Sequence, residues 1–389
     1  AKRSDRMSSD AQYALTQDQL DFLEVIRQMV VERVTPRAHD IDESGEFPQD
    51  IRELFAEHDL FGLPFEEKHG GTGTGELMLC AAVEEIAKGC ASSSLMVAAQ
   101  DLSSLPMKLA GSDELKDRIL PKMASGEWLG AFCLSEPDAG SDPGAMRTRA
   151  TKVDGGWKLN GAKNWITNSG VADVYVTFAV TDPDVKFSRG ITCFAVMADA
   201  EGFRIDALEK KMGMKGSPTG QPVYEDVFVP DEDVIGEVGK GFAVAMQTLD
   251  RSRLGIGAQA LGIAQGATDY AADYAKERIA FGKPINQLQG IQFKLADMET
   301  KTAAARELLY KAASMAETND PGLGKYSAMA KLFASDVAME VTTEAVQVLG
   351  GYGYVREYPV ERMMRDAKLT QIYEGTNEIQ RVVIARNLM

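Results

Sequence analysis

Histidine and cysteine are both scarce in this chain of 389 residues. Only three histidines are present, His39, His58 and His69, so a zinc site or a Ser-His-Asp triad would have to use one of them, and we expect neither. No pair of cysteines has the CxxC spacing, and the chain has too few for a disulfide framework. This cysteine usage is typical of a reducing compartment. The four cysteines are Cys80, Cys90, Cys133 and Cys193.

Positive charge is also in deficit, and long apolar runs are missing. The chain has 42 Lys and Arg against 58 Asp and Glu, a net charge of −16, which argues against general affinity for nucleic acid or anionic membranes. No stretch approaches the roughly 18 consecutive apolar residues of a membrane span. The basic start at Ala1–Arg6 lacks the apolar region of a secretory signal. We expect a cytoplasmic protein if the source is bacterial, or a mitochondrial matrix protein with its transit peptide removed if it is eukaryotic.

Hydrophobic residues make up 44% of the chain and charged residues 26%, as in an ordinary folded protein. The two ends of the sequence have the apolar spacing of helices. Near the N-terminus, Leu20 to Val34 follow one helix face until Pro36 disturbs the pattern, and further helices are predicted at 51–61, 77–88 and 113–123. Three long helices are predicted near the C-terminus, at 242–280, 285–317 and 326–349, followed by a short one at 377–387.

The segment from Trp128 to about Val234 has a different pattern, with short β-type runs at 174–180, 191–196 and 223–229. Turns are expected at Asp154–Gly156 and, as an Asn-Gly hairpin signal, at Asn160–Gly161. Because no helices alternate with these strands, the pattern predicts a small antiparallel barrel or sandwich and disfavours a Rossmann domain. The predicted fold is α+β, with a helical domain at 1–127, a β-domain at 128–235 and a helical bundle at 236–389.

Four segments have unusual combinations of polar, aromatic and small residues. Each also has a plain structural interpretation: the first two as hairpin turns, the third as a helix end with cations, the fourth as a helix cap. A glycine-rich loop at 68–75 has neither a preceding strand nor a following Lys-Ser/Thr, so we interpret it as a helix connector. The four segments are 132–142, 164–168, 277–283 and 372–381.

Three motifs in the same register carry a family resemblance. They are Ala131–Pro137 continued by Gly140–Asp142, Gln347–Gly353, and Arg365–Ala367 continued by Ile372–Thr376. In order and spacing the chain resembles the acyl-CoA dehydrogenase family over essentially its whole length, and is most similar to the short-chain or short/branched-chain members. The resemblance implies an N-terminal helical domain, a middle β-domain and a C-terminal four-helix bundle.

The resemblance also implies bound FAD, shared between the β-domain, the bundle and a neighbouring subunit in a homotetramer built as a dimer of dimers. An electron-transferring flavoprotein is the implied acceptor. The flavin-side contacts by position are Phe132, Leu134, Ser135, Gly140, Ser141, Trp165, Ile166 and Thr167. The resemblance implies that the partner subunit contacts the ADP half of FAD with Arg278, Phe281, Gln289, Gln347, Gly350 and Gly351. Thr376 and Glu378, at a helix start, are further implied FAD contacts.

The implied reaction is α,β-dehydrogenation of an acyl-CoA to the trans-2-enoyl-CoA, with a base for the α-proton and hydride passing to flavin N5. Glu374 matches the base position of most family members. Some relatives carry the base on the first bundle helix instead, but the corresponding stretch Leu249–Leu254 has no glutamate. Asp250 is therefore given a structural or CoA-proximal role.

Substrate contacts by match are Ser141, Asp250, Arg253, Gly375 and Arg386. For Arg253, a solvated helix cation is the alternative. Bulky Leu95 and Met96 are expected to close the acyl pocket, which favours short or branched chains, unless both side chains turn into the domain core. Two other functions stay open: an acyl-CoA oxidase on the same fold, and a non-catalytic helical scaffold.

Overall fold

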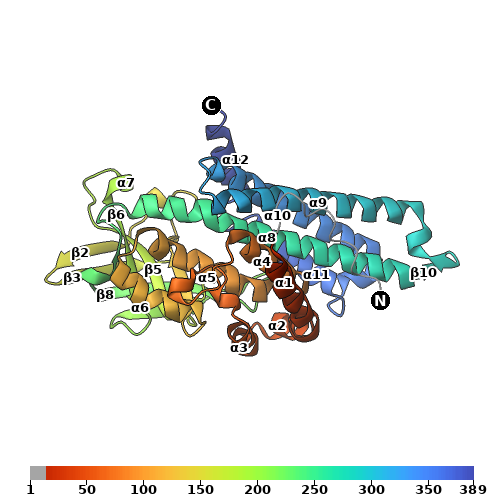
Figure 1. Cartoon of the computed structure of the whole chain (residues 1–389), viewed down its shortest axis with the longest axis horizontal. Coiled ribbons are helices and arrows are strands. Elements are labelled where there is room, and N and C mark those ends of the chain that lie inside the picture. The colour runs from red at the N-terminus through yellow and green to blue at the C-terminus, as the bar shows by residue number, and fades with distance from the viewer. Residues whose placement is uncertain (1–14) are drawn as a thin grey trace. The chain divides into compact units, whose positions relative to one another are not determined.

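The structure is a computed structural model that describes residues 15–389, and its elements follow the order helices, strands, helices (Figure 1). By their contacts the residues form two units. Unit 1 comprises 74–94 and 253–389 together with the chain up to Asp40, and unit 2 comprises 41–73 and 95–252. These units do not follow the sequence order, so the three-domain division at 127/128 and 235/236 stays a prediction.

Unit 2 contains most of the strands. Its helices, wholly or mainly, are α2 (Ala38–Ser44), α3 (Gln49–Glu57), α5 (Ala91–Ala110), α6 (Asp113–Ala124) and α7 (Phe187–Gly190). Its strands are β1 (Gly130–Cys133), β2 (Arg149–Val153), β3 (Gly156–Ala162), β4 (Ile166–Thr167), β5 (Val174–Val180), β6 (Ile191–Met197), β7 (Phe203–Leu208), β8 (Thr219–Pro230) and β9 (Val234–Ile235).

One nine-stranded sheet joins these strands in the order β4-β8-β3-β2-β5-β6-β9, with β1 added to β5 and β7 added to β8. Most pairs are antiparallel, as the sequence predicted, but β1 and β2 each pair with β5 in parallel. Within residues 15–389 the strand order does not close on itself. The middle region is therefore a mixed, open sheet rather than a closed antiparallel barrel.

The two central strands, β5 and β6, are buried along almost their whole length. On one face of β5, Val174, Val176 and Phe178 join a core that includes Ile119 of α6. On the other face, Tyr175 packs in a second core with Trp157 and Tyr224. A strand with both faces covered reads as a continuous apolar run, which is why 174–180 and 191–196 are visible in the sequence.

The two turn signals have different outcomes. Asp154 and Gly155 form the two-residue turn between β2 and β3, as predicted. Asn160–Gly161 is not a hairpin turn: it lies inside β3, at an irregularity in the pairing with β8. Asn160 instead bonds across the sheet to Asp226. A Cβ at Gly161 would lie 2.6 Å from Thr148 Oγ1, so the glycine serves close packing.

Unit 1 is helical. It contains α1 (Gln17–Met29), α4 (Glu76–Gly89), most of α8 (Gly241–Glu277), α9 (Gln289–Glu317), α10 (Leu323–Leu349), α11 (Pro359–Thr370) and α12 (Asn377–Arg386), with a small hairpin of β10 (Ile279–Ala280) and β11 (Lys283–Pro284). A capping box of Thr16 and Gln19 starts α1. Near Pro36, where the sequence predicts a disturbance, α1 gives way to π-helical Val30–Val34 and 3₁₀-helical Thr35–Arg37.

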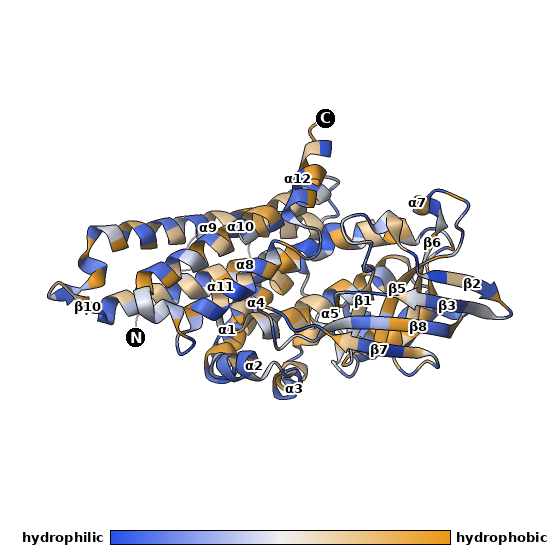
Figure 2. Ribbon diagram, turned by 180° about the vertical axis from the view of Figure 1, so that it is seen from behind, coloured by the Kyte–Doolittle hydropathy of each residue, from blue (hydrophilic) through white to orange (hydrophobic). Residues whose placement is uncertain are grey.

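The long helices pack along α10, which contacts α9, α11 and α12. In α9 the buried residues recur every three or four positions, among them Met298, Thr302, Ala305 and Leu309. Figure 2 accordingly shows hydrophilic and hydrophobic residues interleaved along this helix. This spacing buries one face and exposes the other, which is the pattern the sequence predicted for 285–317.

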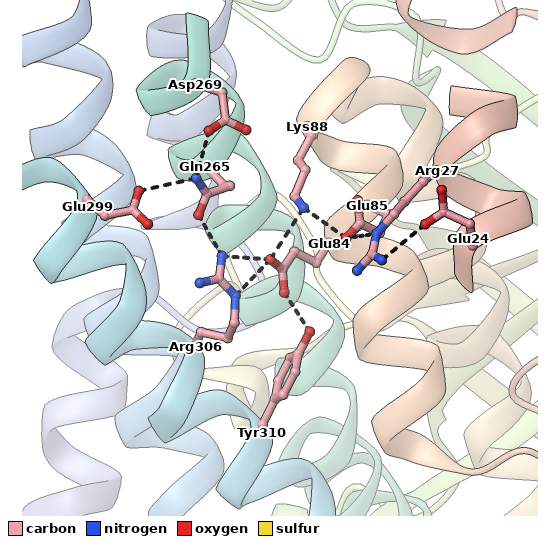
Figure 3. Close-up of polar contacts among 10 residues, drawn as sticks. All are labelled: Glu24, Arg27, Glu84, Glu85, Lys88, Gln265, Asp269, Glu299, Arg306 and Tyr310. Atoms are coloured by element: carbon pink, nitrogen blue, oxygen red, sulfur yellow. Dashed lines mark hydrogen bonds and ion pairs between the residues drawn. The ribbon is translucent and has the colours of Figure 1, made fainter. Parts of the chain in front are cut away.

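Helix α4 is fixed to its neighbours by charge as well as by packing (Figure 3). Glu84, which is fully buried, accepts bonds from Arg306 at 2.9 and 3.0 Å and from the Tyr310 hydroxyl at 2.8 Å, both on α9. Glu85 accepts a 3.0 Å bond from Arg27 of α1. Burial would raise the pKa of Glu84, but Arg306, Lys88 and the Tyr310 hydrogen bond together lower it. The carboxylate is therefore charged and paired.

Candidate functional site

Two of the predicted flavin segments of unit 2 lie side by side. The loop 134–142 leaves β1, and 164–165 leads into β4. The backbone N–H of Asn164 donates to the Ser135 carbonyl at 3.0 Å. The Asn164 side-chain oxygen in turn accepts a 2.9 Å bond from the N–H of Trp165. The structure thus brings Leu134, Ser135 and Trp165 into one surface region.

A buried ion pair connects to the backbone next to both segments. Lys163 is fully buried, and its Nζ donates to Glu136 Oε1 at 2.8 Å and to the Leu134 carbonyl at 3.2 Å. Glu136 also accepts backbone N–H bonds from Arg147 and Thr148. Burial lowers the pKa of Lys163. Burial would raise the pKa of Glu136, but Lys163 and the hydrogen bonds lower it overall, so the carboxylate stays ionised.

The predicted flavin residues differ in their exposure. Trp165 is 59% exposed and has a left-handed φ of 62°, an uncommon conformation for a bulky residue. Leu134 and Ile166 are buried. An exposed aromatic plane held by a rigid, hydrogen-bonded base can stack on a planar ligand. The remaining members lie in the same two segments, half-buried or exposed: Phe132, Ser135, Gly140, Ser141 and Thr167.

Unit 1 has a hollow of about 840 Å³ where α8, the β10–β11 hairpin and the end of α10 meet. Of the predicted residues, Arg278, Phe281, Gly350 and Gly351 line it. Phe281 is 91% exposed and left-handed, with φ 52°. A Cβ at Gly350 or Gly351 would meet nothing within 4 Å, so this wall is bare backbone.

Aromatic residues that sequence reasoning missed complete this hollow. Tyr274, Tyr352 and Tyr358 line it, and the Arg278 guanidinium lies 5.2 Å from the centre of the Tyr352 ring. Tyr274 precedes Arg278 by one helical turn, which is the spacing that could have revealed it. Gln289 and Gln347 do not line the hollow and are exposed beside it.

The donor set of this hollow fits part of a dinucleotide. A guanidinium can bind pyrophosphate in charge-assisted bonds, and bare glycine backbone lets a ligand approach closely. Tyrosine and leucine walls suit an apolar base or sugar face. Within residues 15–389 no group of three His, Cys, Asp or Glu could hold a metal ion, and no helix is long and apolar enough to cross a membrane.

Glu374 lies in the turn between α11 and α12. It is half-buried and left-handed, with φ 51°, and Gly375 follows at φ 88°. The left-handed conformation is costly for the glutamate, although not for the glycine, and such backbone strain gathers at functional sites. The Thr376 hydroxyl then caps α12 by accepting the Ile379 N–H at 3.3 Å. Hydrogen bonds to its own backbone and to Thr376 lower the pKa of exposed Glu378.

The predicted CoA residues are distributed over several elements. Arg253 is only 4% exposed, so the alternative of a solvated helix cation is wrong. It lies near Gly375, whose Cβ position would be 3.9 Å from Arg253 Nη2. Asp250 is half-buried one helical turn earlier on α8, and Arg386 is exposed at the end of α12.

Leu95 and Met96 on α5 are 4% and 3% exposed. Both interpretations of these side chains, a pocket floor and a domain core, are compatible with this burial.

Three family models match the chain in sequence order. They describe the N-terminal domain of acyl-CoA dehydrogenase at residues 16–127, the middle domain at 131–227 and the C-terminal domain at 239–389.

Individual proteins are similar over nearly the full length. A probable acyl-CoA dehydrogenase of Mycobacterium tuberculosis is 47% identical over 378 residues, covering 97% of each chain. The structure of butyryl-CoA dehydrogenase from Megasphaera elsdenii is 45% identical with a TM-score of 0.94, over 96% of this chain and 99% of that one. A chain in the structure of the electron transferring flavoprotein of Acidaminococcus fermentans is 42% identical with a TM-score of 0.95, over 97% and 99%.

Proposed function

Because the chain belongs to the acyl-CoA dehydrogenase family of FAD-dependent oxidoreductases, we propose that it oxidises an acyl-CoA thioester between Cα and Cβ. The product is the trans-2-enoyl-CoA. The family match covers the helical ends and the middle sheet, and the named relatives at 43% identity or more include several acyl-CoA dehydrogenases.

Glu374 is the base in this proposal, and it takes the α-proton. The observation that carries the assignment is the left-handed turn at Glu374 and Gly375, which holds a half-buried carboxylate in a strained backbone. The α-carbon of a thioester is a very weak acid in water, so the site must polarise the carbonyl while keeping the base from water. The Glu374 backbone N–H is proposed to donate to the thioester oxygen.

FAD is the proposed cofactor, and when bound its N5 accepts the β-hydrogen as hydride. On the unit 2 side, Trp165 would provide an apolar wall, and Ser135 and Thr167 would offer hydroxyls to polar ring edges. In the proposed homotetramer, unit 1 of a neighbouring subunit would supply Arg278 and the bare backbone at Gly350 and Gly351 to the pyrophosphate half. Thr376 and Glu378 at the start of α12 are further proposed contacts.

The decisive experiment is Glu374→Gln. We expect this variant to keep FAD and acyl-CoA binding but to lose at least about 10²-fold in kcat, because the amide cannot accept the proton. Flavin bleaching by substrate in a stopped-flow instrument measures the step directly. Glu307→Gln, an exposed glutamate of α9, is the matched control. Near-normal turnover of Glu374→Gln would move the base to Asp250.

An electron-transferring flavoprotein is the proposed acceptor, supported by the similarity to the Acidaminococcus fermentans chain. Steady turnover that needs such a flavoprotein, with little peroxide, distinguishes the dehydrogenase from an acyl-CoA oxidase. A purified protein without flavin would instead indicate the non-catalytic scaffold.

We further propose a short or branched acyl substrate and a homotetrameric assembly. The likeness to butyryl-CoA dehydrogenase and the bulk of Leu95 and Met96 support the first. The exposure of Phe281 and of the hollow beside it supports the second, because an exposed apolar surface suits a subunit contact. A panel of four-carbon to twelve-carbon acyl-CoAs, scored by flavin bleaching, identifies the substrate length.

The cytoplasm or, in a eukaryote, the mitochondrial matrix stays the proposed location.

A further inference from the structure

Lys331 lies in the interior of unit 1 beneath the turn that carries Glu374. It is 0% exposed and lies in the first half of α10. Its Nζ donates to the Gly375 carbonyl at 2.8 Å and to the Asn377 side-chain oxygen at 3.0 Å. A buried lysine is rare unless it has a partner or a role. Here it contacts the residue that follows the proposed base.

The same turn is tied to α10 at a second point. Asn377 donates from Nδ2 to Ser335 Oγ at 2.9 Å and to Asp336 Oδ1 at 2.7 Å. Gln371, at the start of the turn, also donates to Asp336 Oδ1 at 2.7 Å. On the α12 side, Gln380 donates to the Gly375 carbonyl at 2.8 Å. The strained backbone at Glu374 is thus held from both sides by surrounding structure, which is what such strain requires.

The oxygens that Lys331 contacts are a carbonyl and an amide, not a carboxylate. An uncharged amine has two N–H bonds, and these two acceptors satisfy both. Burial lowers the pKa of Lys331 to about 7, and the charge of Glu374 is the strongest influence in the opposite direction. The amino group therefore changes its charge near neutral pH.

The charged groups around Lys331 come from several elements. Arg253 of α8 lowers its pKa, whereas Asp336 of α10 and Glu378 of α12 raise it together with Glu374. On α11, the charge of Asp366 contributes to the raised pKa of Tyr373, which precedes Glu374.

On α9, Glu307 and Lys311 are exposed to solvent. Among the groups named around Lys331, Glu374 is the one whose charge changes in the proposed reaction.

We propose that Lys331 is a positioning residue for Glu374: it holds the turn through Gly375 and Asn377, and the charge of its amino group is coupled to the charge of the Glu374 carboxylate. This inference rests on the proposed function only where it concerns the rate. Lys331 neither touches the substrate nor takes a proton in the reaction. A positive charge there favours ionised Glu374, and ionised Glu374 favours a protonated Lys331, because such coupling is reciprocal.

The kinetic test compares Lys331→Met with Lys331→Gln in the FAD-loaded enzyme. Lys331→Met removes both the bonds and the charge. We expect a drop in kcat of about tenfold or more, with the acyl-CoA Kd within about threefold, because the loss is one of geometry at the base. Removing a nearby positive charge also raises the apparent pKa of a carboxylate, so the acid limb of the kcat profile should move up by about half a unit or more.

Lys331→Gln keeps an N–H donor but no charge. It should regain kcat to within about threefold of the unmodified enzyme while keeping the raised acid limb. Lys325→Met, almost two turns earlier on α10, is the matched control and should change neither quantity. A profile of Lys331→Met that superimposes on the control overturns the proposal. So does a lower kcat with an unmoved acid limb, because that result indicates a purely structural role.

A second measurement is independent of catalysis. With the lysine Cε carbons ¹³C-labelled, the NMR titration of Lys331 should have a lower midpoint in Glu374→Gln than in the unmodified protein, because the carboxylate charge is gone. An unchanged midpoint overturns the coupling whichever residue is the base. If Glu374→Gln turns over normally while the midpoint still falls, the proposed function fails and the coupling stands.

Discussion

Two lysines, one in each unit, are fully buried beneath a predicted site segment, but they are accommodated differently. Lys163 in unit 2 is paired with the Glu136 carboxylate at 2.8 Å. Lys331 in unit 1 donates to a carbonyl and an amide oxygen. Both donate to the backbone of the segment they support, at Leu134 and Gly375 respectively.

The difference lies in the acceptor, which is an ionised carboxylate for Lys163 and two uncharged oxygens for Lys331. The pKa of Glu136 is lowered, so the carboxylate of the unit 2 pair stays ionised and holds its loop with a constant charge. The pKa of Lys331 is about 7, so its charge changes in the range where an enzyme works. The proposed flavin platform needs only rigidity, whereas the proposed base, which would gain a proton in each turnover, benefits from a neighbour whose charge can respond. Three predictions test this comparison.

The largest effect is expected from Lys163→Met. It leaves the Glu136 carboxylate buried without its cation, and breaking a buried pair in this way costs about 3–5 kcal/mol. Urea unfolding of the flavin-loaded protein measures the loss. Changing both partners, in Lys163→Met with Glu136→Gln, should recover much of it. The comparison fails if Lys163→Met is no more destabilising than Lys331→Met, which leaves no carboxylate in contact.

An intermediate effect is expected in the pH dependence of stability. Lys331 has a pKa of about 7 in the folded protein against an ordinary value of 10.5. Between these values the unfolded state binds more protons than the folded state, so this residue makes stability rise with pH across that window. Lys331→Met should remove that part of the rise. The free energy of unfolding of the unmodified protein minus that of Lys331→Met should increase from pH 7 to pH 9. An unchanged difference would refute a depressed pKa.

The smallest effect is expected from Ser335→Ala. Its hydroxyl and Asn377 share bonds of 2.9 and 3.1 Å, but Asn377 keeps Lys331 and Asp336 as partners. Losing both bonds should cost about 2 kcal/mol of stability and leave kcat within about threefold. Thermal melts and initial rates measure both. A loss of kcat as large as that of Lys331→Met would show that the whole cluster, not the lysine, positions the turn.

The helices and the central strands were predictable because the apolar residues that each element buries recur regularly in the sequence. The period of 326–349 matches α10, and the apolar runs 174–180 and 191–196 match β5 and β6. The parallel pairing of β1 with β5 was not predictable, because the four residues of β1 carry no signal of their partner. The hairpin turn predicted at Asn160–Gly161 was wrong for a related reason. The sequence does not distinguish a glycine that allows close packing inside a strand from a glycine that forms a turn.

The candidate site was predictable where a motif identifies it and not where packing does. Glu374, Arg278 and Trp165 lie in segments whose composition is unusual. Tyr274 and Lys331 lie within long helices, where an aromatic or a lysine attracts no notice. Their roles appear only when helices from distant parts of the sequence meet.

The glycines of α8 have a consequence for how this protein tolerates change. A Cβ at Gly262 would lie 2.2 Å from the Glu84 carbonyl oxygen, and one at Gly266 would lie 2.5 Å from that of Lys88. These carbonyls are one turn apart on α4, as the glycines are on α8, so the two backbones touch along a shared line. In a library of random substitutions, nearly every codon other than glycine would be lost at both positions. Two residues that carry no side chain are thus among the least replaceable in the chain.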